Sequence, residues 1–259
     1  MEVLLSEKNP LLKQVRRAVA KGSLTDDGFA VAEGFHLLEE ALKSSAEIGT
    51  VIVAQSVKSA IQSHVKGVKV RVVTVRDADF NALASTETPQ GVISLVRPPE
   101  WTLDQVLRGR AMVAVLDGIQ DPGNAGAILR AAEAFGATGA AFLKGSVSPY
   151  NPKCMRASAG SVFRLPIAVA LDESLLLAAL GKKRGVLYAA MPRANILVSD
   201  ANFKISCAIV IGSEGRGVSQ HLAEFATALR IPTTGVESLN AAVAAGILFY
   251  EARRQRNAS

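Results

Sequence analysis

Three short motifs in the second half of the chain place polar residues that could do chemistry beside apolar segments. Each joins a strand-like run or a glycine-rich turn to a few polar side chains that neither a core nor a surface requires. One such motif alone is weak evidence for a site, whereas three in order at sensible spacing are strong. The motifs are LDGIQDPGNAGAILRAAEAFGA (residues 116–137), IVIGSEGRGVS (209–219) and IPTTGVESLNAAVAAGILFYEA (231–252).

The first motif predicts a strand that ends at Asp117, a turn, and a helix that carries Arg130. Asn124 stands near the expected helix start, where capping explains it as well as a functional role does. Capping does not explain Arg130, which lies about one and a half turns into the helix among small residues. Small neighbours let a ligand approach closely, and a guanidinium offers a fork of donors for a phosphate or carboxylate.

The second motif, GSEGRG, follows an apolar strand, and its glycines allow close approach of a ligand or another chain segment. It is not a P-loop, because Val218 rather than lysine follows Gly217, and its glycine order differs from that of the dinucleotide fingerprint. Glu214 would repel a phosphate, so the turn suits a cationic or zwitterionic ligand. The alternative is a glycine-rich turn with a solvated glutamate.

The third motif leaves a strand at Ile231 and enters a helix near Ser238 and Asn240. Both polar residues are also ordinary helix-cap or first-turn residues. The first turns of that helix hold many small residues, which predicts tight packing against a ligand loop or a second subunit.

The elements that must position these motifs form an α/β pattern. In the first half, predicted strands and helices alternate, which favours an α/β sandwich. Pro98 and Pro99 break the pattern, because proline continues neither a strand ladder nor a helix interior. We therefore predict a first domain over residues 1–97, a linker over 98–105 and a second domain over 106–259. The strands are expected at 29–34, 50–54, 68–75 and 91–96, and the helices at 36–43, 57–64 and 78–83.

The second half restarts with a continuous apolar run that fits a buried parallel strand. Further strand and helix segments follow in alternation, which predicts a doubly wound α/β fold. The strands are expected at 111–119, 139–143, 185–191, 206–212 and 228–232, and the helices at 126–135, 175–182 and 239–254.

The net charge of +6 is concentrated in the second half. Residues 1–105 hold 12 Lys and Arg against 13 Asp and Glu, and residues 106–259 hold 17 against 10. A basic half suits a polyanion such as nucleic acid, although many basic proteins bind none. A further, basic helix is expected before residue 29; at helical spacing Lys13, Arg16 and Arg17 share one of its faces, which is either a nucleic-acid contact or a solvated surface.

Composition also excludes several classes of protein. Cys154 and Cys207 are far apart and form no C-x-x-C pair, so neither a metal site nor a disulfide framework is expected. No apolar stretch reaches membrane-spanning length, and the N-terminus lacks an apolar signal core. We expect a cytoplasmic protein that binds neither a membrane nor a metal.

Together the three motifs resemble those of the SpoU-type (TrmH-like) RNA ribose methyltransferases, in the SPOUT class of knotted methyltransferases. The middle segment SPYNPKCMRASAGSVFRLPI (148–167) is similar to the same family, and AEGFHLLEEAL (32–42) resembles its substrate-binding domain. The resemblance implies a small ribosomal-protein-like α/β RNA-binding domain, followed by an α/β trefoil-knot methyltransferase domain. It also implies S-adenosylmethionine as cofactor and a homodimer whose active site is completed across the interface.

The resemblance also assigns roles residue by residue. The family's catalytic positions fall on Asn124, Arg130, Glu214, Ser238 and Asn240. Its cofactor contacts, largely through backbone, fall on Gly212, Ser213, Gly215, Ile231 and Leu239. The basic residues expected to bind RNA are Lys13, Arg16, Arg17, Lys153 and Arg156.

The implied reaction is methyl transfer to a ribose 2′-hydroxyl, which depends chiefly on in-line placement of the hydroxyl. A guanidinium keeps its proton at ordinary pH, so we expect Arg130 to grip a phosphate and stabilise the alkoxide rather than act as a base. Ala242 departs from the family, where many members have serine, and the loop before Ser238 is one residue shorter than in several relatives.

Ribosomal RNA is favoured over transfer RNA as the substrate, because a separate N-terminal domain resembles the branch that docks on structured ribosomal segments. A transfer-RNA ribose methyltransferase is the alternative. A non-catalytic RNA-binding protein that retains the fold is supported only by Ala242. A Rossmann-type oxidoreductase lacks the dinucleotide fingerprint.

Overall fold

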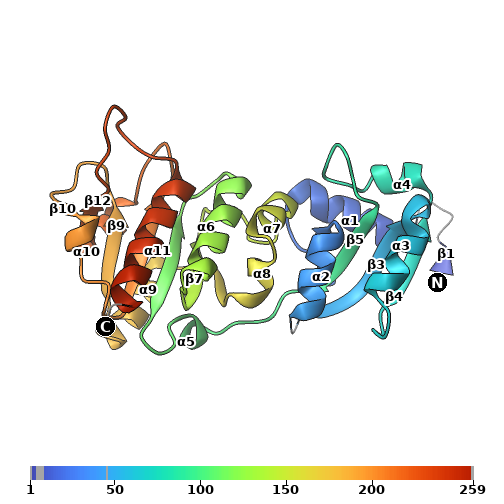
Figure 1. Cartoon of the computed structure of the whole chain (residues 1–259), viewed down its shortest axis with the longest axis horizontal. Coiled ribbons are helices and arrows are strands. Elements are labelled where there is room, and N and C mark those ends of the chain that lie inside the picture. Colours follow the sequence, from blue (N-terminus) through green and yellow to red (C-terminus); the bar gives the residue numbers. More distant parts are fainter. Residues whose placement is uncertain (1, 4–8, 45, 258–259) are drawn as a thin grey trace. The chain divides into compact units, whose positions relative to one another are not determined.

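The computed structural model describes residues 2–3, 9–44 and 46–257, which form two compact units (Figure 1). The described residues of Met1–Glu100 and Tyr150–Arg164 make the first unit, and those of Trp101–Pro149 and Leu165–Ser259 make the second. Tyr150–Arg164 therefore packs with the first unit, although the sequence division assigned it to residues 106–259. The domain boundaries predicted from the prolines stay a prediction.

The first unit is built on a mixed five-stranded sheet in the order β1-β4-β3-β5-β2. β1 pairs with β4 and β4 with β3 in parallel, whereas β5 runs antiparallel to both β3 and β2. The strands are β1 (Glu2–Val3), β2 (Ala30–Glu33), β3 (Glu47–Ala54), β4 (Arg71–Val75) and β5 (Val92–Arg97). The helices are α1 (Pro10–Lys21), α2 (Phe35–Lys43), η1 (Gln55–Val57), α3 (Lys58–His64), α4 (Asp77–Asn81), α7 (Pro152–Ser158) and α8 (Ser161–Arg164).

Alternation along β3 divides the core of this unit between the two faces of its sheet. Ile52 packs in a cluster with Val15 of α1 and Phe80 of α4. Val51 and Val53 pack in another cluster, with residues of α2 and α3. Because neighbouring side chains of a strand point to opposite faces, α1 and α2 cover opposite faces of the sheet.

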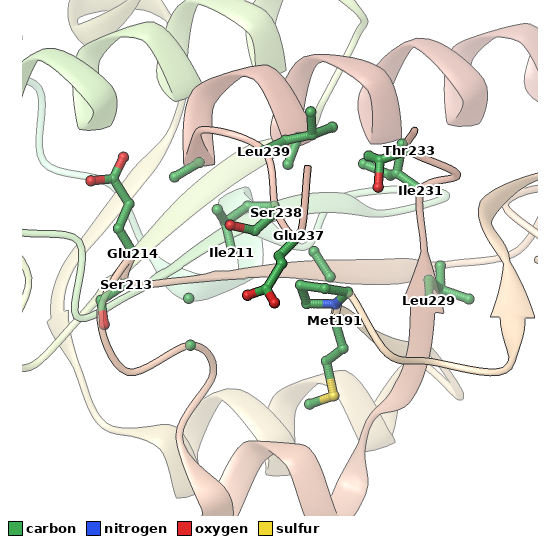
Figure 2. A pocket seen from close by; sticks show the side chains of 16 residues that line it. Met191, Ile211, Ser213, Glu214, Leu229, Ile231, Thr233, Glu237, Ser238 and Leu239 are labelled. Carbon is green, nitrogen blue, oxygen red and sulfur yellow. The ribbon is translucent and has the colours of Figure 1, made fainter. Parts of the chain in front are cut away.

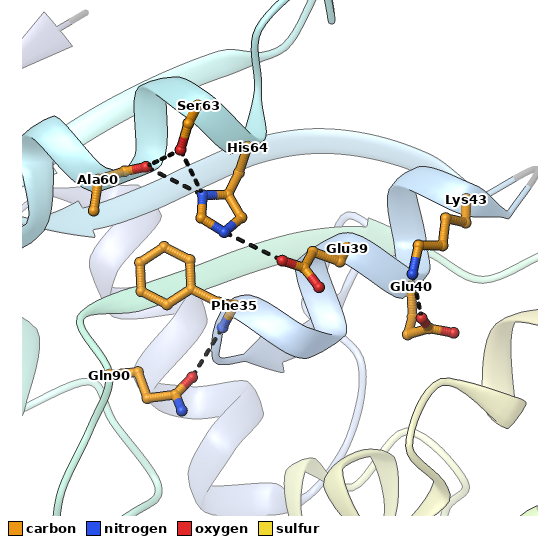
Figure 3. A network of polar contacts seen from close by, with 8 residues as sticks. All are labelled: Phe35, Glu39, Glu40, Lys43, Ala60, Ser63, His64 and Gln90. Carbon is orange, nitrogen blue, oxygen red and sulfur yellow. Dashed lines mark hydrogen bonds and ion pairs between the residues drawn. The ribbon is translucent and has the colours of Figure 1, made fainter.

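The start of α2 depends on a side chain from a distant loop. Gly34 supplies no side-chain cap, and Gln90 Oε1 instead accepts a hydrogen bond of 3.0 Å from the Phe35 amide (Figure 3). Gly34 has a φ of 101°, and a Cβ there would lie 2.8 Å from Gln90 Oε1. His64 of α3 stands 3.2 Å from Glu39 Oε1 and so joins α3 to α2 (Figure 3).

The second unit is built on a seven-stranded parallel sheet in the order β10-β12-β9-β11-β6-β7-β8. Its strands are β6 (Met112–Asp117), β7 (Gly139–Leu143), β8 (Ile167–Leu171), β9 (Val186–Ala190), β10 (Ile196–Leu197), β11 (Cys207–Gly212) and β12 (Thr227–Arg230). Its helices are α5 (Leu103–Val106), α6 (Pro122–Ala134), α9 (Glu173–Lys182), η2 (Val198–Asp200), α10 (Gln220–Phe225) and α11 (Ala241–Asn257). The parallel sheet with helices confirms the predicted α/β fold class.

The central strands of this sheet read as apolar runs because helices cover both faces. Every residue of β6 is buried, and β11 lies between β6 and β9. Burial raises the pKa of Cys207, at the start of β11, to about 11. Because β9, β11 and β6 are adjacent and parallel, their carboxyl ends lie together at one end of the sheet, where α/β folds commonly bind ligands.

Several elements differ from the predicted ones. α5 begins at Leu103 inside the predicted linker, because Thr102 and Gln105 form a capping box. β4 begins at Arg71 rather than residue 68. β8, β10 and α10 were not predicted; β10 has two residues and β8 is an edge strand with exposed side chains.

Candidate active site

A pocket opens at the carboxyl ends of β9, β11 and β12 (Figure 2). Its space, including the open mouth, is about 800 Å³. The loop before α11 and the first turn of that helix close one side. The lining residues are Ala190, Met191, Pro192, Ile211, Gly212, Ser213, Glu214, Gly217, Leu229, Ile231, Thr233, Glu237, Ser238, Leu239, Ala241 and Ala244.

The turn after β11 brings backbone close to backbone at the pocket wall. Ser213 and Gly217 exchange two hydrogen bonds, of 3.1 and 2.8 Å, between amides and carbonyls. A Cβ on Gly212 would lie 2.2 Å from the Gly217 carbonyl carbon, so only glycine fits there. Gly215, in contrast, has open space around it and is not among the lining residues.

Three side chains from the three sequence motifs meet beside this turn. Glu214 Oε1 accepts a hydrogen bond of 2.8 Å from Asn124 Nδ2 and one of 3.1 Å from Asn240 Nδ2. Asn240 Nδ2 also lies 3.0 Å from Asn124 Oδ1, which closes the cluster. The two amides occupy one oxygen of the carboxylate and hold α6, the β11 turn and the start of α11 together.

The cap interpretation of Asn124 is wrong. α6 begins at Pro122, and the N-cap is Asp121, whose Oδ1 accepts a hydrogen bond of 2.7 Å from the Asn124 amide. The side chain of Asn124 is therefore available to bind Glu214.

The cap interpretation of Asn240 is confirmed alongside its place in the cluster. Its Oδ1 accepts hydrogen bonds from the amides of Ala242, at 2.9 Å, and Val243, at 3.3 Å. Because Oδ1 holds the helix, Nδ2 is fixed in the direction of Glu214. Ala242 contributes its backbone to this arrangement, and serine there would add only a hydroxyl.

Arg130 lies outside this cluster. It is exposed on α6, and six residues place it about 120° around the helix from Asn124. Within the described residues it forms no hydrogen bond or ion pair, and Glu214 is bound instead to Asn124 and Asn240. Ser238 and Leu239 line the pocket, and Ser238 is exposed there.

The sequence did not indicate Glu237, yet its carboxylate points into the pocket (Figure 2). Glu214 and Glu237 are the charged residues of the lining, and no lysine or arginine belongs to it. The adjacency of Glu237 to Ser238 was the available indication. No group of three or more His, Cys, Asp or Glu in the described part of the chain could hold a metal ion.

The basic residues expected to bind RNA all belong to the first unit. Lys13 and Lys153 are exposed, whereas Arg16 is half-buried. Arg17 forms an ion pair of 2.8 Å with Asp26.

Arg156 of α7 contacts a buried acid that the sequence did not indicate. Its Nη1 lies 3.3 Å from Glu33 Oε2 and 2.5 Å from the Ser85 hydroxyl. The Ser85 amide also donates to Glu33, at 2.9 Å. Glu33 thus joins β2, α7 and the loop after α4, and Arg156 serves the packing of this unit.

Two known families match successive parts of the chain. Residues 111–250 match the SpoU rRNA Methylase family, and residues 9–94 match the MRM3-like substrate binding domain. Within the described ranges, every helix is too short or too polar to span a lipid bilayer.

Relatives align over nearly the full chain. The 23S rRNA (guanosine(2553)-2'-O)-methyltransferase RlmP of Bacillus subtilis is 31% identical over 98% of this chain and 100% of its own. An uncharacterized tRNA/rRNA methyltransferase of Synechocystis is 33% identical over 98% of this chain and 94% of its own. The SpoU methyltransferase AviRb from Streptomyces viridochromogenes, solved with the cofactor AdoMet, has a TM-score of 0.87 at 25% identity and covers 96% of this chain and 99% of its own. The chain therefore belongs to the SpoU rRNA methylase family.

Proposed function

We propose that this protein transfers the methyl group of S-adenosylmethionine to a ribose 2′-hydroxyl of structured RNA, with ribosomal RNA as the substrate. The observation that carries this proposal is the meeting of Asn124, Glu214 and Asn240, one residue from each motif, beside a pocket. The substrate named for RlmP, 23S rRNA, supports ribosomal over transfer RNA.

The pocket fits the cofactor. Gly212, Ser213, Ile231 and Leu239 belong to its lining and would hold the cofactor, partly through the exposed backbone of the β11 turn. Gly215 lies in the same turn and outside the lining, so its proposed contact with the cofactor would be made through the backbone alone. A largely apolar lining with two carboxylates and no cation suits an uncharged ring system joined to a cationic group. S-adenosylmethionine supplies the electrophilic methyl group.

The remaining polar residues would position the RNA. Asn124 and Asn240, fixed by Glu214, would orient the ribose, and the Ser238 hydroxyl would contact it from the pocket mouth. Arg130 would bind the adjacent phosphate and stabilise the developing alkoxide, because a guanidinium does not give up its proton. The hydroxyl proton would leave to phosphate or water.

A homodimer is part of the proposal because Arg130 stands apart from the cluster in a single chain. Val243 and Tyr250 expose large apolar surface on α11, at 52% and 56%. α11 packs beside α6, which carries Arg130, so a second copy seated there would cover both helices.

A trefoil knot in the C-terminal segments and a cytoplasmic location are further parts of the proposal. RNA binding by the first unit is another, through Lys13, Arg16, Arg17, Lys153 and Arg156.

The test is tritiated methyl transfer from S-adenosylmethionine to protein-free large-subunit, small-subunit and transfer RNA. The expected result is alkali-resistant label in large-subunit RNA alone. Label in transfer RNA alone would establish the alternative substrate. Absence of label together with absence of cofactor binding by calorimetry would contradict the proposal and favour a non-catalytic RNA-binding protein.

A further inference from the structure

Six exposed cations gather at the amino ends of three central strands of the second unit's sheet, whereas the pocket lies at the carboxyl ends. We call this surface the basic edge. It consists of the residues that precede three adjacent parallel strands: Arg108 and Arg110 before β6, Lys182, Lys183 and Arg184 before β9, and Lys204 before β11.

Strand register places these segments side by side. Cys207 of β11 is paired with Met112 on one side and with Val186 on the other. Backbone contacts extend the alignment outward, since Arg110 Nη1 lies 3.4 Å from the Lys204 carbonyl and the Val186 amide lies 3.0 Å from the Ser206 carbonyl.

The end of α11 reinforces the same edge. Arg256 donates to the carbonyls of Arg110, at 2.9 Å, and Ile205, at 2.7 Å. Burial lowers the pKa of Arg256, and the nearby charge of Arg110 lowers it further. The chain thus brings like charges together here against their mutual repulsion.

These charges are not compensated by acids. None of the six forms an ion pair within the described residues. Glu251, on the last turns of α11, is already bound to Arg254 at 2.7 Å. Arg108 and Arg110 donate to backbone carbonyls, which leaves their positive charge in place.

Arg184 occupies a backbone position that favours glycine over residues with a side chain. Its φ is 49°, in the left-handed region, at the turn between α9 and β9. A side chain there costs about 1 kcal/mol relative to glycine. A cation therefore stands where glycine would be more stable.

We propose that the basic edge is a second RNA-binding surface, which contacts the phosphate backbone of the substrate at a distance from the methylated nucleotide. β11 has six residues, so about 20 Å separates its amino end, at the basic edge, from its carboxyl end, at the pocket. RNA that reaches from the pocket mouth around the unit would contact several phosphates there. This inference rests on the proposed function only in taking RNA as the substrate.

The test compares the salt dependence of RNA affinity in the wild-type protein and in the triple variant Lys182→Ser, Lys183→Ser, Arg184→Gly. The probe is protein-free large-subunit RNA, measured by filter binding at several salt concentrations. Each lost phosphate contact lowers the slope of log affinity against log salt by about 0.7 to 0.9. We expect the slope to fall by about two and the affinity at low salt to fall about tenfold.

Two controls separate this effect from misfolding and from overall charge. Arg184→Gly alone relieves the left-handed backbone, so its thermal midpoint should not fall while RNA affinity does. The triple variant Lys58→Ser, Lys66→Ser, Lys69→Ser removes the same charge from exposed positions of the first unit and should change the slope by less than one.

An unchanged slope in the basic-edge variant, or an equal change in the control, would overturn the inference. Loss of binding to phosphatidylglycerol vesicles without loss of RNA binding would assign the surface to a membrane and overturn it as well. Cofactor affinity, measured by calorimetry, should be unchanged in every variant. If the wild-type protein does not bind S-adenosylmethionine, the proposed function is contradicted, but the salt dependence of RNA affinity still tests the basic edge.

Discussion

Asn124 Nδ2 donates a hydrogen bond of 2.8 Å to Glu214 Oε1, which joins the third residue of α6 to the turn after β11 across 90 positions of sequence. The same oxygen accepts from Asn240. One carboxylate oxygen thus fixes two amides, and each of the motifs that supply these residues contains further residues assigned to the site.

Glu214→Ala should lower kcat for methyl transfer about 100-fold, because small displacements of positioning groups cost roughly that factor. Asn124 and Asn240 still contact each other at 3.0 Å, so the thermal midpoint should change little. Glu214→Gln keeps the accepting oxygen and should retain more activity than alanine. Single-turnover kinetics would decide, and equal losses in both variants would show that charge rather than hydrogen bonding matters.

Arg130→Ala should lower methyl transfer without changing the affinity for S-adenosylmethionine. Arg130 is exposed and lies outside the pocket lining, so cofactor binding does not depend on it. Arg130→Lys keeps the charge but loses the planar fork, and should recover only part of the rate. Calorimetry and kinetics on the same preparations would check this, and a loss of cofactor affinity would contradict the assigned role.

Glu237→Gln should weaken S-adenosylmethionine binding several-fold and S-adenosylhomocysteine binding less. Only the former carries the sulfonium charge, and the Glu237 carboxylate points into the pocket (Figure 2). Glu224→Gln, on α10 and outside the lining, is the matched control. Equal effects on both ligands would mean that Glu237 does not discriminate by charge.

Gly212→Ala should abolish cofactor binding, whereas Gly215→Ala should be tolerated. A Cβ at position 212 would meet the Gly217 backbone at 2.2 Å, while one at position 215 meets nothing within 4 Å. The two variants carry the same chemical change three residues apart. Circular dichroism with calorimetry would compare them, and tolerance of Gly212→Ala would contradict the rigid turn.

Long apolar strands, with glycine-rich turns after them, made much of this fold predictable from the sequence. β6 and β11 are buried runs beside glycine-rich turns, and both were predicted. β10 has two residues and β8 lies at an edge, so neither carries a continuous buried pattern. The short helix α5 was missed because prolines before it indicated a linker, although its Thr102 cap was present in the sequence.

The site was predictable in its members but not in their contacts. Motif resemblance named Asn124, Glu214 and Asn240, yet only the fold places all three at one carboxylate oxygen. Glu33 could not be found, because a buried carboxylate within an apolar strand gains meaning only from its partners on α7 and in the loop after α4. The basic edge depends likewise on strand register, which no local pattern specifies.

The most direct test of the central claim is nucleoside analysis of large-subunit RNA after incubation with the protein and S-adenosylmethionine. The RNA is digested to nucleosides and separated by liquid chromatography with mass detection. The prediction is one 2′-O-methylated nucleoside that approaches one per RNA molecule and disappears with Asn124→Ala. A base-methylated nucleoside, or no methylated nucleoside in RNA or assembled subunits despite bound cofactor, would contradict it.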